Sequence, residues 1–412
     1  MHRMLACVGL FVVLGQASSV AQTIAPQGES RDARWRDDVR FVAQELPTRH
    51  KNAFAYVSRD AFAREAVRLD SAVPRLNDAQ MQLGLARLVA MLRDGHTRVP
   101  LPTYERRLPI TIVWLDRGPY IVNADDEHGE LIGALITSVN GRPIREVADT
   151  LRLYFSFENE LGFRISPGNL LLRPRALRDV GLGGDSLATR LTVTSHERTW
   201  DVTVAAVPSD RFALVQRGPL PLYRQRPRER YWWMYMAAER TVFLQYNQCE
   251  DAGAFRLLVD SVTRAIDDEK PLRVVVDLRN NSGGNSQVVR PLIEALRSRP
   301  QLNRPDALYA IIGRATFSSG LFAANDFRTQ TRATLIGEPS GERANHYGEV
   351  RSVKLPYSGL ELTYSTNFHR LVDGDGERFA PDVLVPPTAE AYIVGRDPAM
   401  EWIVAHSRQG SP

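Results

Sequence analysis

Two segments of the chain combine a buried strand with a polar turn that could do chemistry. The first is the strand pattern Val274–Leu278, which breaks into Arg279–Gly284, a turn with two consecutive glycines. The second is Tyr309–Ile312, which is followed by Thr316–Ser319 at the start of a helical pattern. A glycine turn can present backbone N–H groups to an oxyanion, and the dipole at a helix start favours the developing anion of a serine nucleophile. Together the two turns predict acyl-transfer chemistry.

The elements around these turns alternate between strands and helices. Strand patterns are followed by helical patterns over residues 242–246, 254–266, 272–278, 288–296, 308–312, 319–328 and 333–337. This alternation predicts an α/β fold with a largely parallel sheet covered by helices, here over residues 228–405. Functional sites in such sheets gather at the carboxyl ends of the strands, where both turns lie.

Two further regions precede this expected core. Residues 30–98 are typical of a helical domain, with Trp35, Val39 and Val42 at helical spacing and Pro47 expected to end that helix. Residues 104–207 favour short strands and tight turns, which predicts a β-rich module. The Pro- and Arg-rich residues 218–230 are interpreted as a linker.

Composition restricts the class of protein. A chain of 412 residues with 43% hydrophobic and 24% charged residues is expected to form two or three globular domains. The net charge is only +4, and the arginines are interleaved with acidic residues, so we expect no nucleic-acid partner. The histidines lack metal-ligand spacing and there is no phosphate-binding loop, so the sequence predicts neither a metal nor a cofactor.

The N-terminus indicates a compartment. A basic start at Met1–Arg3 precedes the apolar residues Leu5–Leu14, and small residues allow cleavage after Ala21. Residues 1–21 are therefore predicted to be a signal peptide, with a mature protein that begins near Gln22 and is periplasmic or secreted. No later segment is long and apolar enough for a transmembrane helix, so we expect no integral membrane segment after cleavage.

Six motifs, in this order, give the chain a resemblance to a known family over roughly residues 35–405. The motifs are Asp94-Gly95-His96-Thr97, Val139-Asn140-Gly141-Arg142-Pro143, residues 277–284, Thr316-Phe317-Ser318-Ser319, Gly337-Glu338-Pro339-Ser340-Gly341 and Pro381-Asp382-Val383. The chain resembles the tail-specific, or C-terminal-processing, serine peptidases of S41 type, in the branch near tricorn protease and retinoid-binding-protein-like modules. This resemblance implies a ClpP/crotonase-like ββα core, an N-terminal helical domain and a PDZ-like module.

The resemblance also assigns the nucleophile and the oxyanion donors. It implies Ser318 as the nucleophile, and backbone N–H groups of Gly283 or Gly284 together with that of Ser319 as the oxyanion hole. The alternative is that Ser318 or Ser319 only caps the helix.

The base differs between branches of the family. One branch uses a lysine, whose place is taken here by Arg343, and arginine cannot accept a proton from serine. Lys354, the nearest lysine, lies within a strand pattern. The tricorn-like branch uses a histidine, which implies His96, an imidazole that titrates near neutral pH. His346 is the alternative base.

The third catalytic group is an acid that lies shortly before Pro381 in the tricorn-like branch. Counting back gives Asp375, with Glu377 and Glu349 as alternatives. We therefore expect an extracytoplasmic serine endopeptidase that acts on peptides or proteins through an acyl-enzyme on Ser318. Two alternatives remain open: an inactive peptide- or ligand-binding protein on the same scaffold, and an esterase. The sequence does not determine the oligomeric state.

Overall fold

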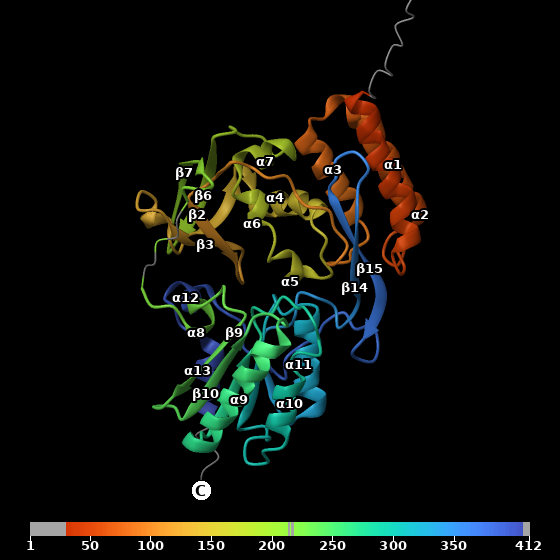
Figure 1. Cartoon of the computed structure of the whole chain (residues 1–412). Coiled ribbons are helices and arrows are strands. Elements are labelled where there is room, and N and C mark those ends of the chain that lie inside the picture. The colour runs from red at the N-terminus through yellow and green to blue at the C-terminus, as the bar shows by residue number, and fades with distance from the viewer. Residues whose placement is uncertain (1–29, 213–214, 216–217, 407–412) are drawn as a thin grey trace, which may run out of the picture.

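The structure is a computed structural model that describes residues 30–212, 215 and 218–406 (Figure 1). The predicted signal peptide, with its cleavage site after Ala21, lies outside these residues. Within the described ranges, no helix combines the length and the apolar character that a membrane crossing requires.

A six-stranded sheet forms the centre of the C-terminal part. Its strands are β9 (Tyr231–Met236), β10 (Thr241–Tyr246), β11 (Arg273–Asp277), β12 (Leu308–Ile312), β13 (Thr334–Gly337) and β16 (Val383–Leu384). They lie in the order β16-β13-β12-β11-β10-β9, with every neighbouring pair parallel except β10 and β9. The predicted α/β class and the parallel arrangement are confirmed.

Helices cover both faces of this sheet because its strands are apolar on both sides. One face packs against α9 (Ala252–Glu269), α10 (Arg290–Arg297) and α11 (Ser319–Gln330), and the other against α13 (Pro398–His406). In β11, Val274 and Val276 point to the first face and Val275 points to the second, as the period of two requires. Two short helices, α8 (Leu222–Gln225) and α12 (Ala389–Ile393), lie beside the sheet, and α8 falls inside the predicted linker.

The N-terminal part is helical, as predicted. It consists of α1 (Arg31–Arg49), α2 (Arg59–Ala72), a 3-10 turn (Val73–Arg75) and α3 (Asp78–Ala90). Asn77 caps α3 in a reciprocal capping box with Gln80. Pro47 does not end α1, which continues to Arg49, because a proline in the last turn removes little of the helical hydrogen bonding.

Residues between these parts form a second sheet with short helices on it. The strands β2 (Ile110–Trp114), β3 (Pro119–Ala124), β4 (Leu135–Val139), β6 (Ala188–Ser195) and β7 (Arg198–Ala205) are neighbours in that order, and β5 (Arg142–Pro143) pairs with β4. A small pair joins β1 (Arg106–Arg107) to β8 (Val207–Pro208). The helices are α4 (Ile144–Leu151), α5 (Glu160–Phe163), α6 (Gly168–Leu171) and α7 (Pro174–Asp179), with 3-10 turns at Gly129–Leu131 and Arg152–Tyr154.

A long hairpin leaves the C-terminal core and reaches the N-terminal helices. It pairs β14 (Asn345–Lys354) with β15 (Glu361–Arg370) and runs upward beside α1 and α3 in Figure 1. Leu362 and Tyr364 join the core of the helical part, and Arg98 exchanges two backbone hydrogen bonds with Thr363 (3.1 and 2.9 Å). The hairpin thus fixes the turn after α3 against the C-terminal core. The sequence predicts only part of β14 as a strand, the part around Lys354.

Candidate active site

Ser318 occupies a strained position between β12 and α11. Its φ of 54° and ψ of −126° lie outside the regions that L-residues normally adopt. The segment before it is held tightly: Thr316 Oγ1 donates to Leu278 O (2.8 Å), and Phe317 N donates to Asn281 O (2.9 Å). Backbone strain that is held in place by its surroundings is common at active sites, where it fixes a reactive side chain.

The glycine turn after β11 packs directly against this serine. A Cβ atom on Gly283 would lie 2.7 Å from Ser318 Cβ and 3.1 Å from Ser319 N, and its φ is 102°. Only glycine fits here without displacement. Ser319 donates its hydroxyl to Gly284 O at 2.6 Å, which joins the turn to the start of α11. The structure therefore brings the three predicted oxyanion residues together next to Ser318.

The backbone donors of this turn differ in availability. The N–H of Gly283 donates to Asn281 Oδ1 at 2.9 Å. Among the described residues, the N–H groups of Gly284 and Ser319 donate no hydrogen bond. These two groups are the ones that could receive an oxyanion without losing an existing partner.

His96 lies over the residue that precedes the nucleophile. It follows α3 in the turn formed by the Asp-Gly-His-Thr motif, and its ring stacks on Phe317 with 4.4 Å between centroids. The side chain is buried, and neither ring nitrogen forms a hydrogen bond with any described residue. Burial lowers the pKa of His96 to about 4, so its imidazole is neutral near pH 7 and can accept a proton.

Asp94 holds the turn that carries His96. Its Oδ2 accepts hydrogen bonds from His50 Nε2 (2.9 Å), Thr97 Oγ1 (2.5 Å) and Ser365 Oγ (2.7 Å), and its Oδ1 accepts from His96 N (3.0 Å). Burial opposes the ionisation of Asp94, but the hydrogen bonds from His50, Thr97 and Ser365 outweigh it and lower the pKa. The donors come from the residue after α1, from the turn itself and from β15, so three separated segments fix the position of His96.

A buried carboxyl group, Glu342, joins the nucleophile segment to the histidine. Its Oε2 accepts a 2.5 Å hydrogen bond from Ser318 N. Its Oε1 forms no hydrogen bond and lies 3.5 Å from His96 Nδ1 and 3.7 Å from His346 Nε2. Burial, reinforced by the neighbouring Glu158, raises the pKa of Glu342 well above its usual value.

Glu158 is a second buried carboxyl group behind Glu342. It accepts backbone hydrogen bonds from Gly95 N (3.3 Å) and Arg343 N (2.7 Å). Burial, with a smaller contribution from Asp94, raises the pKa of Glu158 to about 8. Glu158 therefore ties the histidine turn to the segment that carries Glu342.

The alternative bases occupy different environments. His346 is buried in the same cluster, 6.1 Å from His96 between ring centroids, and its Nδ1 lies 3.1 Å from Arg343 O, which makes Nδ1 the protonated nitrogen. Arg343, at the position of the family lysine, donates its N–H to Glu158. Lys354 is exposed at the end of β14. Two histidines, rather than a lysine, thus lie near Ser318.

The three acids expected from the sequence are exposed. Asp375 and Glu377 share a surface turn, in which Asp375 Oδ1 accepts a hydrogen bond from Glu377 N at 3.2 Å. Glu349 lies in β14, and its Oε1 accepts from Asn367 Nδ2 at 3.2 Å. No hydrogen bond or ion pair joins any of these three described carboxylates to His96.

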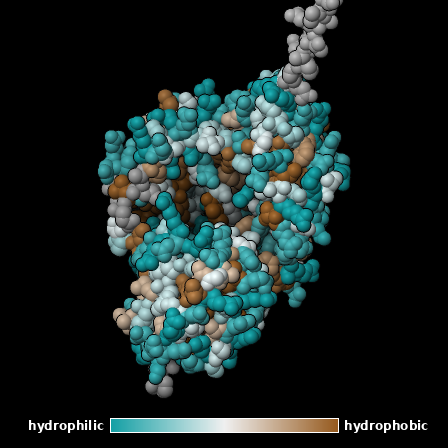
Figure 2. Space-filling model, in the orientation of Figure 1, coloured by the Kyte–Doolittle hydropathy of each residue, from teal (hydrophilic) through white to brown (hydrophobic). Residues whose placement is uncertain are grey.

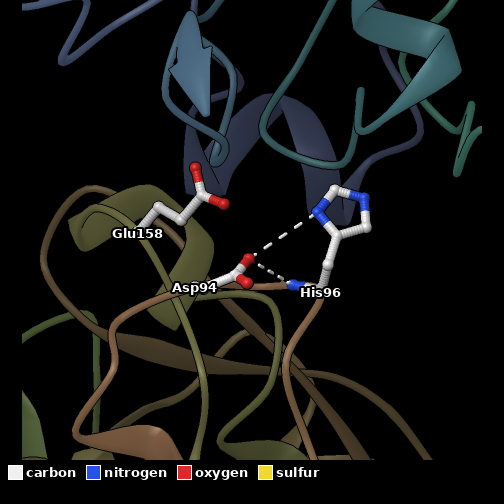
Figure 3. A group of neighbouring side chains, drawn as sticks. All are labelled: Asp94, His96 and Glu158. Carbon is white, nitrogen blue, oxygen red and sulfur yellow. Dashed lines mark hydrogen bonds and ion pairs between the residues drawn. The ribbon is translucent and has the colours of Figure 1, made fainter. Parts of the chain in front are cut away.

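Asp94, His96 and Glu158 lie close enough together to be considered as metal ligands (Figure 3). The carboxylate oxygens of Asp94 and Glu158 already accept hydrogen bonds from protein donors. The imidazole nitrogens of His96 form no hydrogen bond with any described residue, and Nδ1 lies 3.9 Å from Asp94 Oδ1. A metal would have to displace several buried hydrogen bonds, so this group is better explained as a scaffold for His96.

Sequence reasoning missed Glu342, Glu158 and His50. Glu342 follows Gly341 in the Gly-Glu-Pro-Ser-Gly motif, so its place next to a motif was a usable signal. Glu158 and His50 carry no local pattern, because their roles depend on contacts with segments distant in the chain.

Comparisons with known proteins agree with this architecture. No protein-family model and no curated protein matches the chain. Among solved structures, mature CPAF complexed with lactacystin matches with a TM-score of 0.61 and 15% identity, over 92% of this chain and 98% of that chain. A CPAF mutant gives a TM-score of 0.62 and 14% identity, over 92% and 97%. The tricorn protease gives 0.45 and 15%, over 92% of this chain and 37% of that one. The likeness shows the fold alone: the chain has the fold of mature CPAF.

Proposed function

We propose that this protein is a serine endopeptidase with Ser318 as nucleophile and His96 as base. The observation that carries the proposal is the meeting of three segments distant in sequence. These are a strained serine at the start of α11, a glycine turn packed on it, and a buried, neutral histidine that stacks on Phe317 and whose ring nitrogens form no hydrogen bond with any described residue. Nucleophile, oxyanion donors and base are the groups that acyl transfer requires.

In this mechanism Ser318 Oγ attacks the carbonyl carbon of the substrate while its proton passes to His96. The N–H groups of Gly284 and Ser319 stabilise the oxyanion, assisted by Gly283 if its bond to Asn281 opens. His96 then returns the proton to the leaving amine, and an acyl-enzyme forms on Ser318. Water, deprotonated by His96, releases the acid product and regenerates the serine.

Glu342 is the acid that we propose for the third role, with Asp375 as the second candidate. A carboxyl group assists a histidine only when it is close to the imidazole. Glu342 meets this condition at 3.5 Å, whereas Asp375 is exposed in its turn. Ionisation of Glu342 would place a negative charge beside the imidazolium that forms during the reaction.

The finer fold assignment belongs to the same proposal. We infer a ClpP/crotonase-like core over residues 228–405, a helical domain over 30–98 and a PDZ-like module over 104–207 that binds extended peptides. The basic start, apolar segment and Ala21 cleavage site support an extracytoplasmic location. N-terminal sequencing of periplasmic or secreted material tests that location: a start near Gln22 supports it, and an intact Met1 in the cytosol contradicts it.

A fluorophosphonate probe tests the catalytic proposal directly. We expect the wild-type protein to be labelled on Ser318, as mapped by mass spectrometry, and the Ser318→Ala variant to remain unlabelled. Digestion of casein then distinguishes a peptidase from an esterase. Absence of labelling in a folded wild-type protein would contradict the proposal.

One observation favours the second candidate, an inactive peptide-binding protein. His96 forms no hydrogen bond to Ser318 in the described state. Catalytic hydrogen bonds are often long or misaligned without substrate, so this geometry does not exclude the peptidase. The same probe separates the two, because a binding protein would not be labelled.

A further inference from the structure

A cavity lies beside the nucleophile segment, between the second sheet and the C-terminal core. Its volume is about 300 Å³, and its walls come from β2, the ends of β12 and β13, α8 and α12. Figure 2 shows the molecule hollowed between these parts, with hydrophobic side chains at the hollow. Ligand pockets start at about 300 Å³, so this cavity suits one or two side chains.

The cavity lies beside the two turns that carry the glycines and the serine of the candidate active site. Asn280 and Ala315 both line it, and each lies three residues before Gly283 and Ser318, respectively. An extended chain spans at most about 3.6 Å per residue, so the wall at Ala315 lies within about 11 Å of Ser318 along the backbone. An extended substrate that places its reacting carbonyl at Ser318 can therefore reach the cavity with a side chain two or three residues away.

The lining is mainly apolar. Its apolar lining residues include Ile112 and Trp114 of β2 and Ile312 of β12, and α8 and α12 add Tyr223 and Tyr392. Apolar surface of this kind favours a side chain that gives up little hydration on entry.

The three arginines on the wall do not make the cavity cationic. Arg279 forms ion pairs with Asp277 (2.5 Å) and Asp397 (2.7 Å), so the three side chains together carry no net positive charge. Its guanidinium also lies 3.8 Å from the ring centre of Tyr223.

The other two arginines are also paired. Arg314 is bound by Glu338 at 2.8 Å, and Arg164 lies 3.6 Å from Glu160. A charged substrate side chain would therefore find no unpaired counter-ion on these arginines, and its burial would be unfavourable.

We propose that this cavity is a specificity subsite for an uncharged apolar side chain of the substrate polypeptide, located two or three residues from the bond that Ser318 cleaves. The expected selectivity in cleavage rests on the proposed peptidase function. The expected selectivity in binding, a preference for apolar side chains, does not require catalysis.

The rim residue Ile165 offers a test that spares the buried core. It lines the cavity and is 50% exposed, so Ile165→Asp should fold normally while placing a negative charge at the entrance. Leu257→Asp is the matched control, because Leu257 is 70% exposed on α9 and does not line this cavity.

The substrates are acetylated alanine-based peptides with a single Leu, Asp or Lys at each position near the cleaved bond. For the wild type we expect kcat/KM to be about 10-fold higher with Leu than with Asp or Lys at one such position, the usual discrimination by an apolar pocket. Ile165→Asp should lower kcat/KM for the Leu peptide and narrow its advantage over the Lys peptide, whereas Leu257→Asp should retain the wild-type profile. An unchanged profile in Ile165→Asp, with normal activity, would overturn the subsite.

A binding measurement keeps this test separate from catalysis. In the Ser318→Ala background, fluorescence anisotropy should show tighter binding of the labelled Leu peptide than of the Asp or Lys peptide, and Ile165→Asp should narrow the advantage of the Leu peptide over the Lys peptide. If the wild type is not labelled by a fluorophosphonate but this selectivity persists, the peptidase proposal fails and the subsite stands. Equal binding of the Leu and Asp peptides would overturn the subsite whatever the activity.

Discussion

The backbone N–H of Ser318 donates a 2.5 Å hydrogen bond to Oε2 of Glu342. The other oxygen of this carboxyl group lies 3.5 Å from Nδ1 of His96. The buried side chain of Glu342 thus contacts the backbone of the nucleophile segment and lies close to the imidazole ring of the base. This relationship determines which variants separate the proposed roles.

Ser318→Ala should abolish hydrolysis and fluorophosphonate labelling while the far-UV circular dichroism stays unchanged. Ser319→Ala is the matched control, because its hydroxyl is already bound to Gly284 O and is not oriented as a nucleophile. We expect Ser319→Ala to keep measurable activity. If Ser319→Ala is inactive and Ser318→Ala is active, the nucleophile has been assigned one residue too early.

His96→Ala should lower kcat by at least about 10²-fold, the usual size of a general-base contribution. His346→Ala should have the smaller effect, because the Nδ1 proton of His346 is directed to Arg343 O, whereas the ring of His96 stacks on Phe317, next to the nucleophile. Steady-state kinetics on a peptide substrate decides between them. A full loss in His346→Ala with normal kcat in His96→Ala would transfer the role of base.

Glu342→Gln should lower kcat, because an amide cannot ionise and therefore cannot place a negative charge beside the histidine that is protonated during the reaction. Asp375→Asn, Glu377→Gln and Glu349→Gln are controls of the same chemistry at exposed positions, and we expect each to remain close to wild type. If Asp375→Asn or Glu377→Gln alone is impaired, the acid is the one expected from the sequence and its turn must move on substrate binding.

Gly283→Ala should reduce the rate of fluorophosphonate labelling by about 10²-fold, the size expected if the displaced turn no longer presents the Gly284 N–H to the oxyanion. The added Cβ would lie 2.7 Å from Ser318 Cβ and would push the turn away from the nucleophile. Gly181→Ala is the control: Gly181 has a φ of 83° but open space around its missing side chain. Equal labelling rates in the two variants would contradict a role for the close packing of Gly283 on Ser318.

The stability of the protein should fall as the pH rises from about 6.5 to 8. Burial raises the pKa of Glu158 to about 8, so the folded state holds a proton in this range that an unfolded glutamate has lost. The free energy of unfolding therefore decreases with pH, by at most about 1.4 kcal/mol per pH unit for one group. His96 and His346, whose pKa values burial lowers to about 4, change stability in the opposite direction, but below about pH 6.5.

Urea denaturation at several pH values measures this slope. In Glu158→Gln the decrease between pH 6.5 and 8 should be smaller than in the wild type, even though the variant is less stable overall. A slope that is unchanged in Glu158→Gln would show that another group carries the proton.

The sequence by itself determined the elements and their class. The spacing of apolar residues between residues 242 and 337 predicted the strands and helices of the α/β core, because each type of element requires a spacing that follows from its own local geometry. The two turns at Gly283 and Ser318 were identified because glycine and serine have distinct local roles, and the parallel sheet brings them together as expected.

The tertiary structure decided the surroundings of the histidine. His96 reaches Phe317 only because the β14–β15 hairpin fixes the turn after α3, with Asp94 bonded to Ser365 of β15. Glu342 and Glu158 became candidates only through burial and through contacts with distant segments. Hydrophobic periodicity reports which face of an element is buried, but it carries no information on which distant polar group shares that interior. The contacts of these carboxyl groups with the histidine turn and the nucleophile segment are therefore visible only in the folded chain.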